Sequence, residues 1–309
     1  MRRLPVVASF CAAATAAVSV HAQAPADPPR ARTFADGIVL DGNLAVPKLG
    51  LGGFGLVGDL ALGYQGTKGG LIASAGFDAY DRVEGASAVV GRRLAISIDG
   101  WLAPGRSVTR FELRPSLGLV DHSNTRLDVG SDQGLFHENS LFLRTQLLFG
   151  LRHEPDEDTA LGVWIGGGAS LEGYAADSVV HQGSSGFRLG GGLSGTASGV
   201  GTVRVRAYLA PWPGSLSLRG RLDAMVFGIT HDAYFFDLSK QVTATTDSHR
   251  STQIDGQSRL FVDLDALSFA GFVPGAHLGL DLFRASTDGE PTATSWVPMV
   301  GVGIRRERF

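Results

Sequence analysis

The segment LFLRTQLLFGLR, Leu141–Arg152, alternates apolar and polar side chains along its length. The apolar residues that fall on one set of alternating positions are Leu141, Leu143, Leu147, Phe149 and Leu151. Polar residues, among them Arg144, Gln146 and Arg152, fill positions between them. Successive side chains of a β-strand point to opposite faces, so this pattern predicts a strand with one apolar and one polar face.

The same alternation recurs along most of the chain, in segments bounded by Gly, Pro, Asp or Ser clusters. The predicted strands are residues 34–47, 52–65, 71–82, 90–103, 106–120, 139–152, 160–173, 186–198, 201–212, 215–228, 232–243, 258–269, 276–285 and 296–307. No segment shows a 3.6-residue period over three turns, so the chain is predicted to be all-β.

The strand count depends on two weaker segments, residues 34–47 and 232–243. Including both gives about 14 strands, which we expect, and places short turns such as APGR, SGVG and GITHD on one side. The other side then receives the long polar segments 121–138, 174–185, 244–257 and 286–295. The alternative is 12 strands, with long and short connections mixed on both sides.

The strand length and the polar face indicate what the apolar face contacts. A soluble β-sandwich is the alternative, because its apolar faces also pack together. The predicted strands run to about 10–14 residues, against ~5–6 for ordinary strands and ~9–11 for tilted membrane strands. Their polar face carries small residues and arginines. In hydrocarbon every backbone group must be paired within the protein, and strands achieve this only in a closed barrel. We therefore expect a closed antiparallel transmembrane β-barrel whose inner glycines leave room in the lumen.

The N-terminal residues are typical of an export signal. Arg2 and Arg3 precede an apolar run, and VHAQA offers a cleavage site after Ala22. We therefore expect a signal peptide at 1–22, a proline-rich linker at 23–33 and the barrel at 34–309. The single cysteine, Cys11, would be removed with the signal, which leaves no disulfide. The formal net charge of −3 argues against a nucleic-acid partner.

Over residues 34–309 the chain resembles the porin-like, bacterial outer-membrane β-barrel class. The resemblance implies an outer-membrane location, contact with outer-membrane lipid, and recognition of the last strand by the barrel assembly machinery. Members of the class usually end in Phe, as this chain does at Phe309. Glu307 and Arg305 stand where the class usually has apolar residues.

Enzymatic and metal sites have little support in the sequence. The best catalytic candidates are DHSN at residues 121–124 and TDSHR at 246–250, both predicted to lie on outer loops. Neither matches the motif of outer-membrane phospholipases, so a hydrolase is the weaker alternative. The histidines are scattered without ligand spacing. We therefore expect no enzyme activity, no cofactor and no metal.

Charges on the predicted inner face are the most informative feature. The middle of the chain supplies a basic wall of Arg110, Arg114, Arg144, Arg188, Arg204, Arg206, Arg219 and Arg221, with Arg93 and Arg152 also facing inward. The two ends of the chain, which closure brings together, supply an acidic wall of Asp59, Asp78, Asp263, Asp265 and Asp281.

These walls predict a transverse field across a pore for ions and small polar solutes. Barrels of ~8 strands are filled by side chains and those of ~16–18 leave a channel, so about 14 strands lie between the two cases. The alternatives are a salt-bridge network that closes the lumen, or a structural or surface-interaction barrel without a pore.

Overall fold

A computed structural model describes residues 37–47, 54–66, 68–84, 87–104, 107–128, 134–156, 158–180, 185–208, 215–237, 242–264, 267, 272–287 and 292–306. They form β1 (Gly37–Pro47), β2 (Phe54–Gln65), β3 (Gly69–Glu84), β4 (Ser87–Leu102), β5 (Thr109–Asp128), β6 (Gly134–Asp156), β7 (Thr159–Val180), β8 (Ser185–Tyr208), β9 (Ser215–Asp237), β10 (Val242–Asp263), β11 (Val273–Thr287) and β12 (Ala293–Arg306). Among these residues no helix has the length and apolar character needed to span a bilayer.

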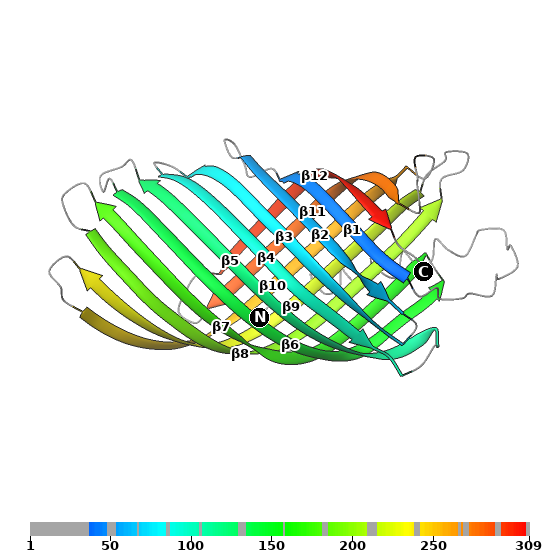
Figure 1. The fold of residues 1–309 in the computed structure, drawn as a ribbon, viewed down its shortest axis with the longest axis horizontal. Coiled ribbons are helices and arrows are strands. Elements are labelled where there is room, and N and C mark those ends of the chain that lie inside the picture. The colour runs from blue at the N-terminus through cyan, green and yellow to red at the C-terminus, as the bar shows by residue number, and fades with distance from the viewer. Residues whose placement is uncertain are drawn as a thin grey trace, which may run out of the picture.

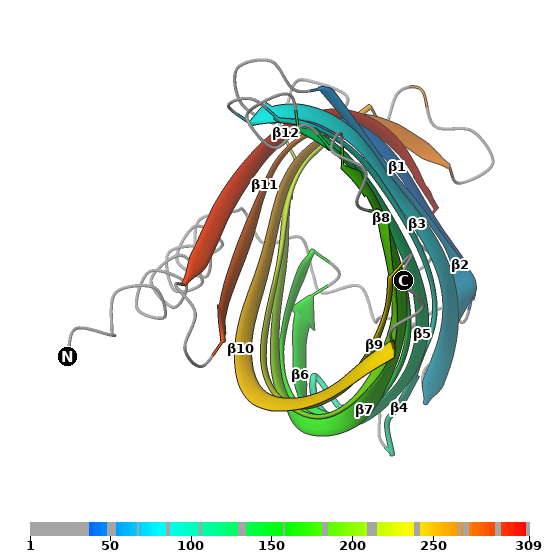
Figure 2. The same ribbon diagram turned by 90° about the vertical axis from the view of Figure 1, so that its left-hand side faces the viewer.

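The strands close into one antiparallel barrel in which each pairs with its neighbours in the chain and β1 pairs with β12. Figure 1 shows the strands crossing the barrel at a steep tilt, and Figure 2 shows them as a closed ring. β1 begins and β12 ends at the same edge of the barrel, because Leu40 pairs with Arg306. We call this edge the terminal end and the other the opposite end. The predicted all-β closed barrel is confirmed.

The barrel has 12 strands, so the preferred count of 14 was wrong and the alternative was right. Two of the expected turns lie inside strands. SGVG belongs to β8, where Gly199 pairs with Ala224 of β9. GITHD belongs to β9, where Ile229 pairs with His249 of β10. Small and polar residues interrupt the apolar alternation at both places, but the backbone ladder continues because its hydrogen bonds do not depend on side chains.

Most of the predicted long loops are also strand. β5 to β10 are 20 to 24 residues long, about twice the ~9–11 residues that a tilted strand needs to cross a bilayer. Residues 121–128 continue β5, residues 174–180 continue β7, and residues 244–257 lie within β10. The extensions were missed because both faces of a strand beyond the lipid can be polar, so alternation no longer marks it.

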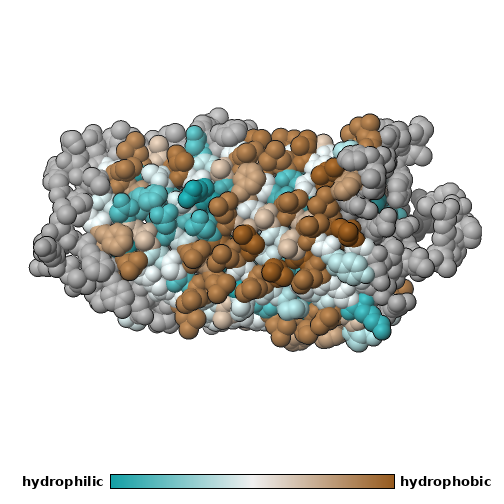
Figure 3. Space-filling view, viewed as in Figure 1, coloured by the Kyte–Doolittle hydropathy of each residue, from teal (hydrophilic) through white to brown (hydrophobic). Residues whose placement is uncertain are grey.

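The apolar face of the strands is the outer surface of the barrel. In β6, the alternating apolar side chains from Leu141 to Leu151 are 42% to 57% exposed. Figure 3 shows brown, hydrophobic atoms gathered over the middle of this surface. So much exposed apolar surface is rare on soluble monomers and suits contact with acyl chains.

Aromatic rings occupy part of the space above the inner glycines. Trp164 of β7 is only 1% exposed, and a Cβ at Gly162 or Gly150 would overlap its indole. Trp101 covers Gly70 in the same way at the β3–β4 pair. These glycines permit close approach of a ring to the wall. The expectation that they leave empty lumen is therefore wrong at these positions.

Candidate functional site

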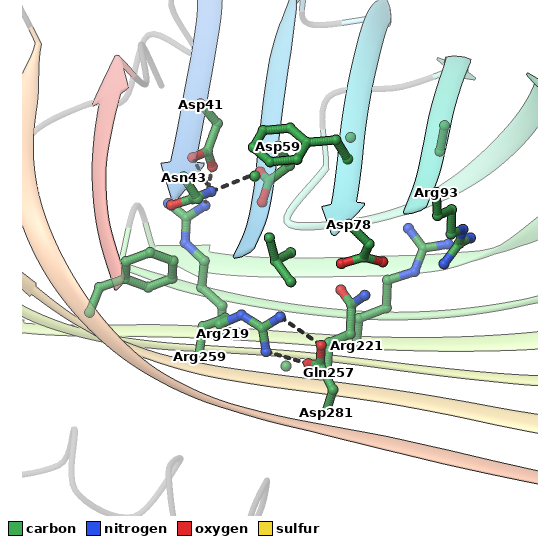
Figure 4. Close-up of a pocket in the computed structure, with 17 residues that line it drawn as sticks. Asp41, Asn43, Asp59, Asp78, Arg93, Arg219, Arg221, Gln257, Arg259 and Asp281 are labelled. Atoms are coloured by element: carbon green, nitrogen blue, oxygen red, sulfur yellow. Dashed lines mark hydrogen bonds and ion pairs between the residues drawn. The ribbon is translucent and has the colours of Figure 1, made fainter. Parts of the chain in front are cut away.

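Inward-facing side chains of seven strands line a cavity of about 440 Å³ inside the barrel. Its charged and amide lining comes from two groups of strands, which Figure 4 shows facing one another: Asp41, Asn43, Asp59, Asp78 and Arg93 from β1–β4, and Arg219, Arg221, Gln257, Arg259 and Asp281 from β9–β11. The cavity is within the range of ~300–1,000 Å³ that is usual for small-molecule sites.

One ion pair crosses the lumen. Arg219 of β9 donates from Nη1 to Oδ2 of Asp41 on β1 at 2.9 Å. β10, β11 and β12 separate these two strands in the ring, so the pair spans the barrel interior and is not a contact between adjacent strands. The Arg219 guanidinium also lies 5.2 Å from the ring of Phe261. The Arg219–Asp41 pair therefore occupies part of the lumen between β9 and β1.

Two further contacts organise the acidic side of the cavity. Arg259 of β10 makes a bidentate pair with Asp281 of β11, in which Nη2 lies 3.0 Å from Oδ2 and Nη1 contacts Oδ1. The Asn43 amide donates to Asp59 at 2.9 Å and to Asp41 at 3.0 Å. Fork geometry and shared amide donors hold such carboxylates in place.

Asp78 and Arg93 differ from these neighbours. They are cross-strand partners of β3 and β4, and Figure 4 shows both side chains projecting into the cavity. Within the described residues neither side chain makes a hydrogen bond or an ion pair, and neither does Gln257. The cavity thus holds an acid and a base whose hydrogen-bonding capacity is unused by the protein.

A second charged cluster lies near the terminal end, on β5 and β6. Glu112 is fully buried and accepts from Arg110 at 2.9 Å and from Arg114 at 3.0 Å. Glu154 accepts from Arg110 at 2.7 Å and also contacts Arg152. The cluster follows from strand geometry, because its members alternate along each strand and Arg110 pairs in register with Arg152. We call these five residues the buried network.

The buried network continues into an aromatic contact. The Arg114 guanidinium stacks 3.7 Å from the ring centre of Trp164. Trp164 in turn packs with Leu148 and Val200, the other two members of a buried apolar cluster. A desolvated cation over a Trp face gains ~2 kcal/mol or more. This wall of the barrel is therefore lined by packed side chains.

The structure places the predicted basic residues in several environments. Arg110, Arg114, Arg219 and Arg221 form ion pairs, Arg144 reaches the Met225 sulfur at 3.9 Å, Arg204 and Arg206 are half-buried on β8, and Arg188 is exposed nearer the opposite end. Acidic residues lie among them: Glu112, Glu154 and Asp223. The basic wall therefore contains much of its own counter-charge.

The predicted acidic residues are likewise divided. Asp59, Asp78 and Asp281 line the cavity. Asp263 is 1% exposed, and the hydroxyls of Ser215 and Ser217 lie 3.3 Å from its Oδ2. Asp265 lies outside the described residues.

Sequence reasoning missed two charged residues of the cavity, Asp41 and Arg259. Both lie inside predicted strands, at 34–47 and 258–269. Their inward parity was available from the register of each strand, since Asp41 alternates with Asn43 and Arg259 with Asp263. The sequence does not show which strands face one another across the lumen, so the contacts of these two residues could not be predicted.

The catalytic candidates lie in strands and not on loops, which corrects their predicted placement. DHSN lies within β5 and TDSHR within β10. In the described part of the chain, no group of three or more His, Cys, Asp or Glu residues is placed to hold a metal ion.

Comparisons with known proteins find similarity in fold alone. No protein-family model matches the sequence, and no match is found among curated proteins. The translocator domain of the autotransporter NalP from Neisseria meningitidis superposes with a TM-score of 0.50 at 14% identity, over 97% of this chain and 95% of that one. The beta domain of the Bordetella autotransporter BrkA gives 0.38 at 13% identity, over 88% and 99%. The KdgM porin gives 0.29 at 10% identity, over 87% and 98%. The chain has the fold of bacterial outer-membrane β-barrels.

Proposed function

We propose that this barrel is a porin-like outer-membrane channel for passive diffusion of ions and small polar solutes. The observation that carries the proposal is the cavity of about 440 Å³ inside the closed barrel, with charged side chains from β1–β4 facing those from β9–β11. Charged groups on opposing walls at short range are what gives a pore its selectivity. No catalytic role is part of the proposal.

The proposal places the barrel in the bacterial outer membrane. Residues 1–22 would act as a cleaved export signal, residues 23–33 as a linker, and residues 34–309 as the barrel embedded in outer-membrane lipid by the assembly machinery. The terminal end, where β1 begins and β12 ends, would face the periplasm. The exposed leucines of the outer surface support insertion in lipid.

Arg93 is the residue with which to test the pore. It lines the cavity and makes no ion pair within the described residues, so Arg93→Glu changes the lumen charge by two units without breaking a contact. In a planar bilayer under a KCl gradient, the wild-type protein should conduct. The variant should shift the reversal potential toward cation preference, because the lumen field changes sign locally.

Arg92→Glu is the matched control. Arg92 adjoins Arg93 on β4 but lies on the outward, exposed face with Leu94 and Ile96. The same change of charge there should leave the reversal potential near the wild-type value. Equal shifts for both variants would contradict a lumen origin of selectivity.

A barrel whose lumen is blocked by side chains is the second candidate, and two observations favour it. The Arg219–Asp41 pair crosses the lumen, and the buried network with Trp164 packs one wall. If folded protein inserts into the bilayer and carries no current at any voltage, the pore proposal is wrong. The extended ends of β5–β10 would then be the place to look for a partner.

A further inference from the structure

Asp78 and Arg93 are an acid and a base of the cavity whose side chains make no hydrogen bond or ion pair within the described residues. Asp78 and Arg93 are directly opposite each other on β3 and β4, where Cβ atoms of cross-strand pairs lie ~4.5–5.5 Å apart. Both side chains line the cavity, and no ion pair joins them. The cavity therefore has a carboxylate and a guanidinium on neighbouring strands, and the hydrogen-bonding groups of both side chains are available to a solute.

The other charged side chains of the cavity each make at least one contact within the protein, and among the described residues Asp59 accepts only from the Asn43 amide at 2.9 Å. Arg219 is paired with Asp41 at 2.9 Å, and Arg259 with Asp281 through two contacts. Arg221, which also lines the cavity, binds Asp223 through its Nε at 2.9 Å. In the described part of the chain, Asp78 and Arg93 are therefore the acid and the base that a solute can bind without competing with any hydrogen bond or ion pair of their own.

We propose that this pair is a recognition site for small zwitterionic solutes, which carry an ammonium and a carboxylate on neighbouring atoms. The ammonium would donate to Asp78, with the Asp59 carboxylate beyond it on β2, and the carboxylate would accept from the Arg93 guanidinium. Charge-assisted hydrogen bonds of this kind are the strong ones, and Arg binds carboxylates through a two-point fork. The inference rests on the proposed channel, and it names the class of solute that the channel favours.

Size and charge balance support this class over simple ions. A cavity of about 440 Å³ admits a small amino acid with water around it. A lone anion at Arg93 would lie close to Asp78, and a lone cation at Asp78 would lie close to Arg93, so each meets a like charge. A solute with both charges satisfies the two positions together.

The test compares alanine with lactamide, its uncharged isomer, in proteoliposome swelling. Conductance in KCl is measured first on the same preparation, because absent conductance contradicts the channel itself. With conductance present, alanine should enter faster than lactamide through the wild-type barrel. Asp78→Asn and Arg93→Gln should each lower the alanine-to-lactamide ratio by about three- to tenfold, since a hydrogen bond to a charged group corresponds to about a tenfold change in occupancy.

Two control variants distinguish binding at Asp78 and Arg93 from a general effect of the charge of the barrel. Asp99→Asn removes a carboxylate from the inner face of β4, the strand that carries Arg93. Asp99 lies outside the cavity and accepts from Ser97 at 2.8 Å. Arg92→Gln removes a charge from the outer face. Both should keep the wild-type ratio. The exchange variant Asp78→Arg/Arg93→Asp preserves the pair and should retain the alanine preference even if a single variant folds poorly.

Heat-modifiable migration of each barrel in detergent gels reports folding. A wild-type ratio near one in a conducting barrel overturns the inference and leaves the channel standing. A ratio that falls as far in Asp99→Asn as in Asp78→Asn also overturns it, because the effect would then reflect net lumen charge. A preference lost only in the two cavity variants, and kept in the exchange variant, supports the site.

Discussion

Glu112→Gln should destabilise the barrel strongly, because Glu112 is the fully buried centre of the buried network. Its two carboxylate oxygens accept from Arg110 at 2.9 Å and from Arg114 at 3.0 Å. The amide that replaces it has nearly the same shape. It removes the charge and points an N–H toward one of the two guanidinium groups, which cannot accept a hydrogen bond.

The size of the effect follows from burial. Removing one partner of a buried ion pair costs about 3–5 kcal/mol, because the remaining charge stays buried without compensation. Arg110 keeps Glu154 at 2.7 Å, so its charge remains paired. Arg114 keeps only its stacking on Trp164 and is about one quarter exposed. The loss should therefore lie near the lower limit, about 3 kcal/mol of unfolding free energy.

Asp223→Asn provides the matched comparison. Arg221 and Asp223 form the same pair of alternating inward residues at the same 2.9 Å, but the Arg221 side chain is 52% exposed. Exposed pairs contribute about 0–1 kcal/mol.

Urea unfolding of the refolded proteins in lipid vesicles, followed by tryptophan fluorescence, measures both variants. A loss below about 1 kcal/mol for Glu112→Gln, or equal losses for the two variants, would refute the argument from burial.

Three further outcomes are expected. Arg219→Gln breaks the ion pair across the lumen and should raise single-channel conductance in a planar bilayer; unchanged conductance would mean that the pair does not limit the pore. Leu147→Arg places a charge on the lipid face and should cost about 2–4 kcal/mol in vesicle unfolding, whereas Gln146→Arg on the inner face should cost less. Cysteines at Leu127 and Ser107 lie toward the opposite and terminal ends, so an impermeant thiol reagent should label only the Leu127 variant on intact cells, and the reverse pattern would invert the orientation.

The fold class could be predicted because it depends on local periodicity. Alternation such as that from Leu141 to Leu151 recurs along most of the barrel, since each side chain of a lipid-facing strand points either to lipid or to the lumen. The strand count could not be predicted with the same rule. SGVG in β8 and GITHD in β9 have turn-like composition, yet their backbones pair continuously with neighbouring strands. A strand continues wherever its backbone hydrogen bonds to the neighbouring strand continue, and amino-acid composition is only an indirect guide to those bonds.

The candidate site shows the same division. The inward direction of Asp59, Asp78 and Arg219 followed from their parity in the sequence, because a strand has a side-chain period of two. The pairing of Arg219 with Asp41 did not, because these residues are 178 positions apart and their strands are not neighbours in the ring.

The sequence by itself thus determined an all-β chain with an apolar outer face and a charged interior, since both depend on which way successive side chains point. Only the tertiary structure decided which charges neutralise one another. Ring closure and strand register set the distances across the lumen. They bury Glu112 between two arginines and leave the side chains of Asp78 and Arg93 with no hydrogen bond or ion pair among the described residues. Coulomb interactions fall with distance and with solvent exposure, and neither quantity is encoded in local periodicity.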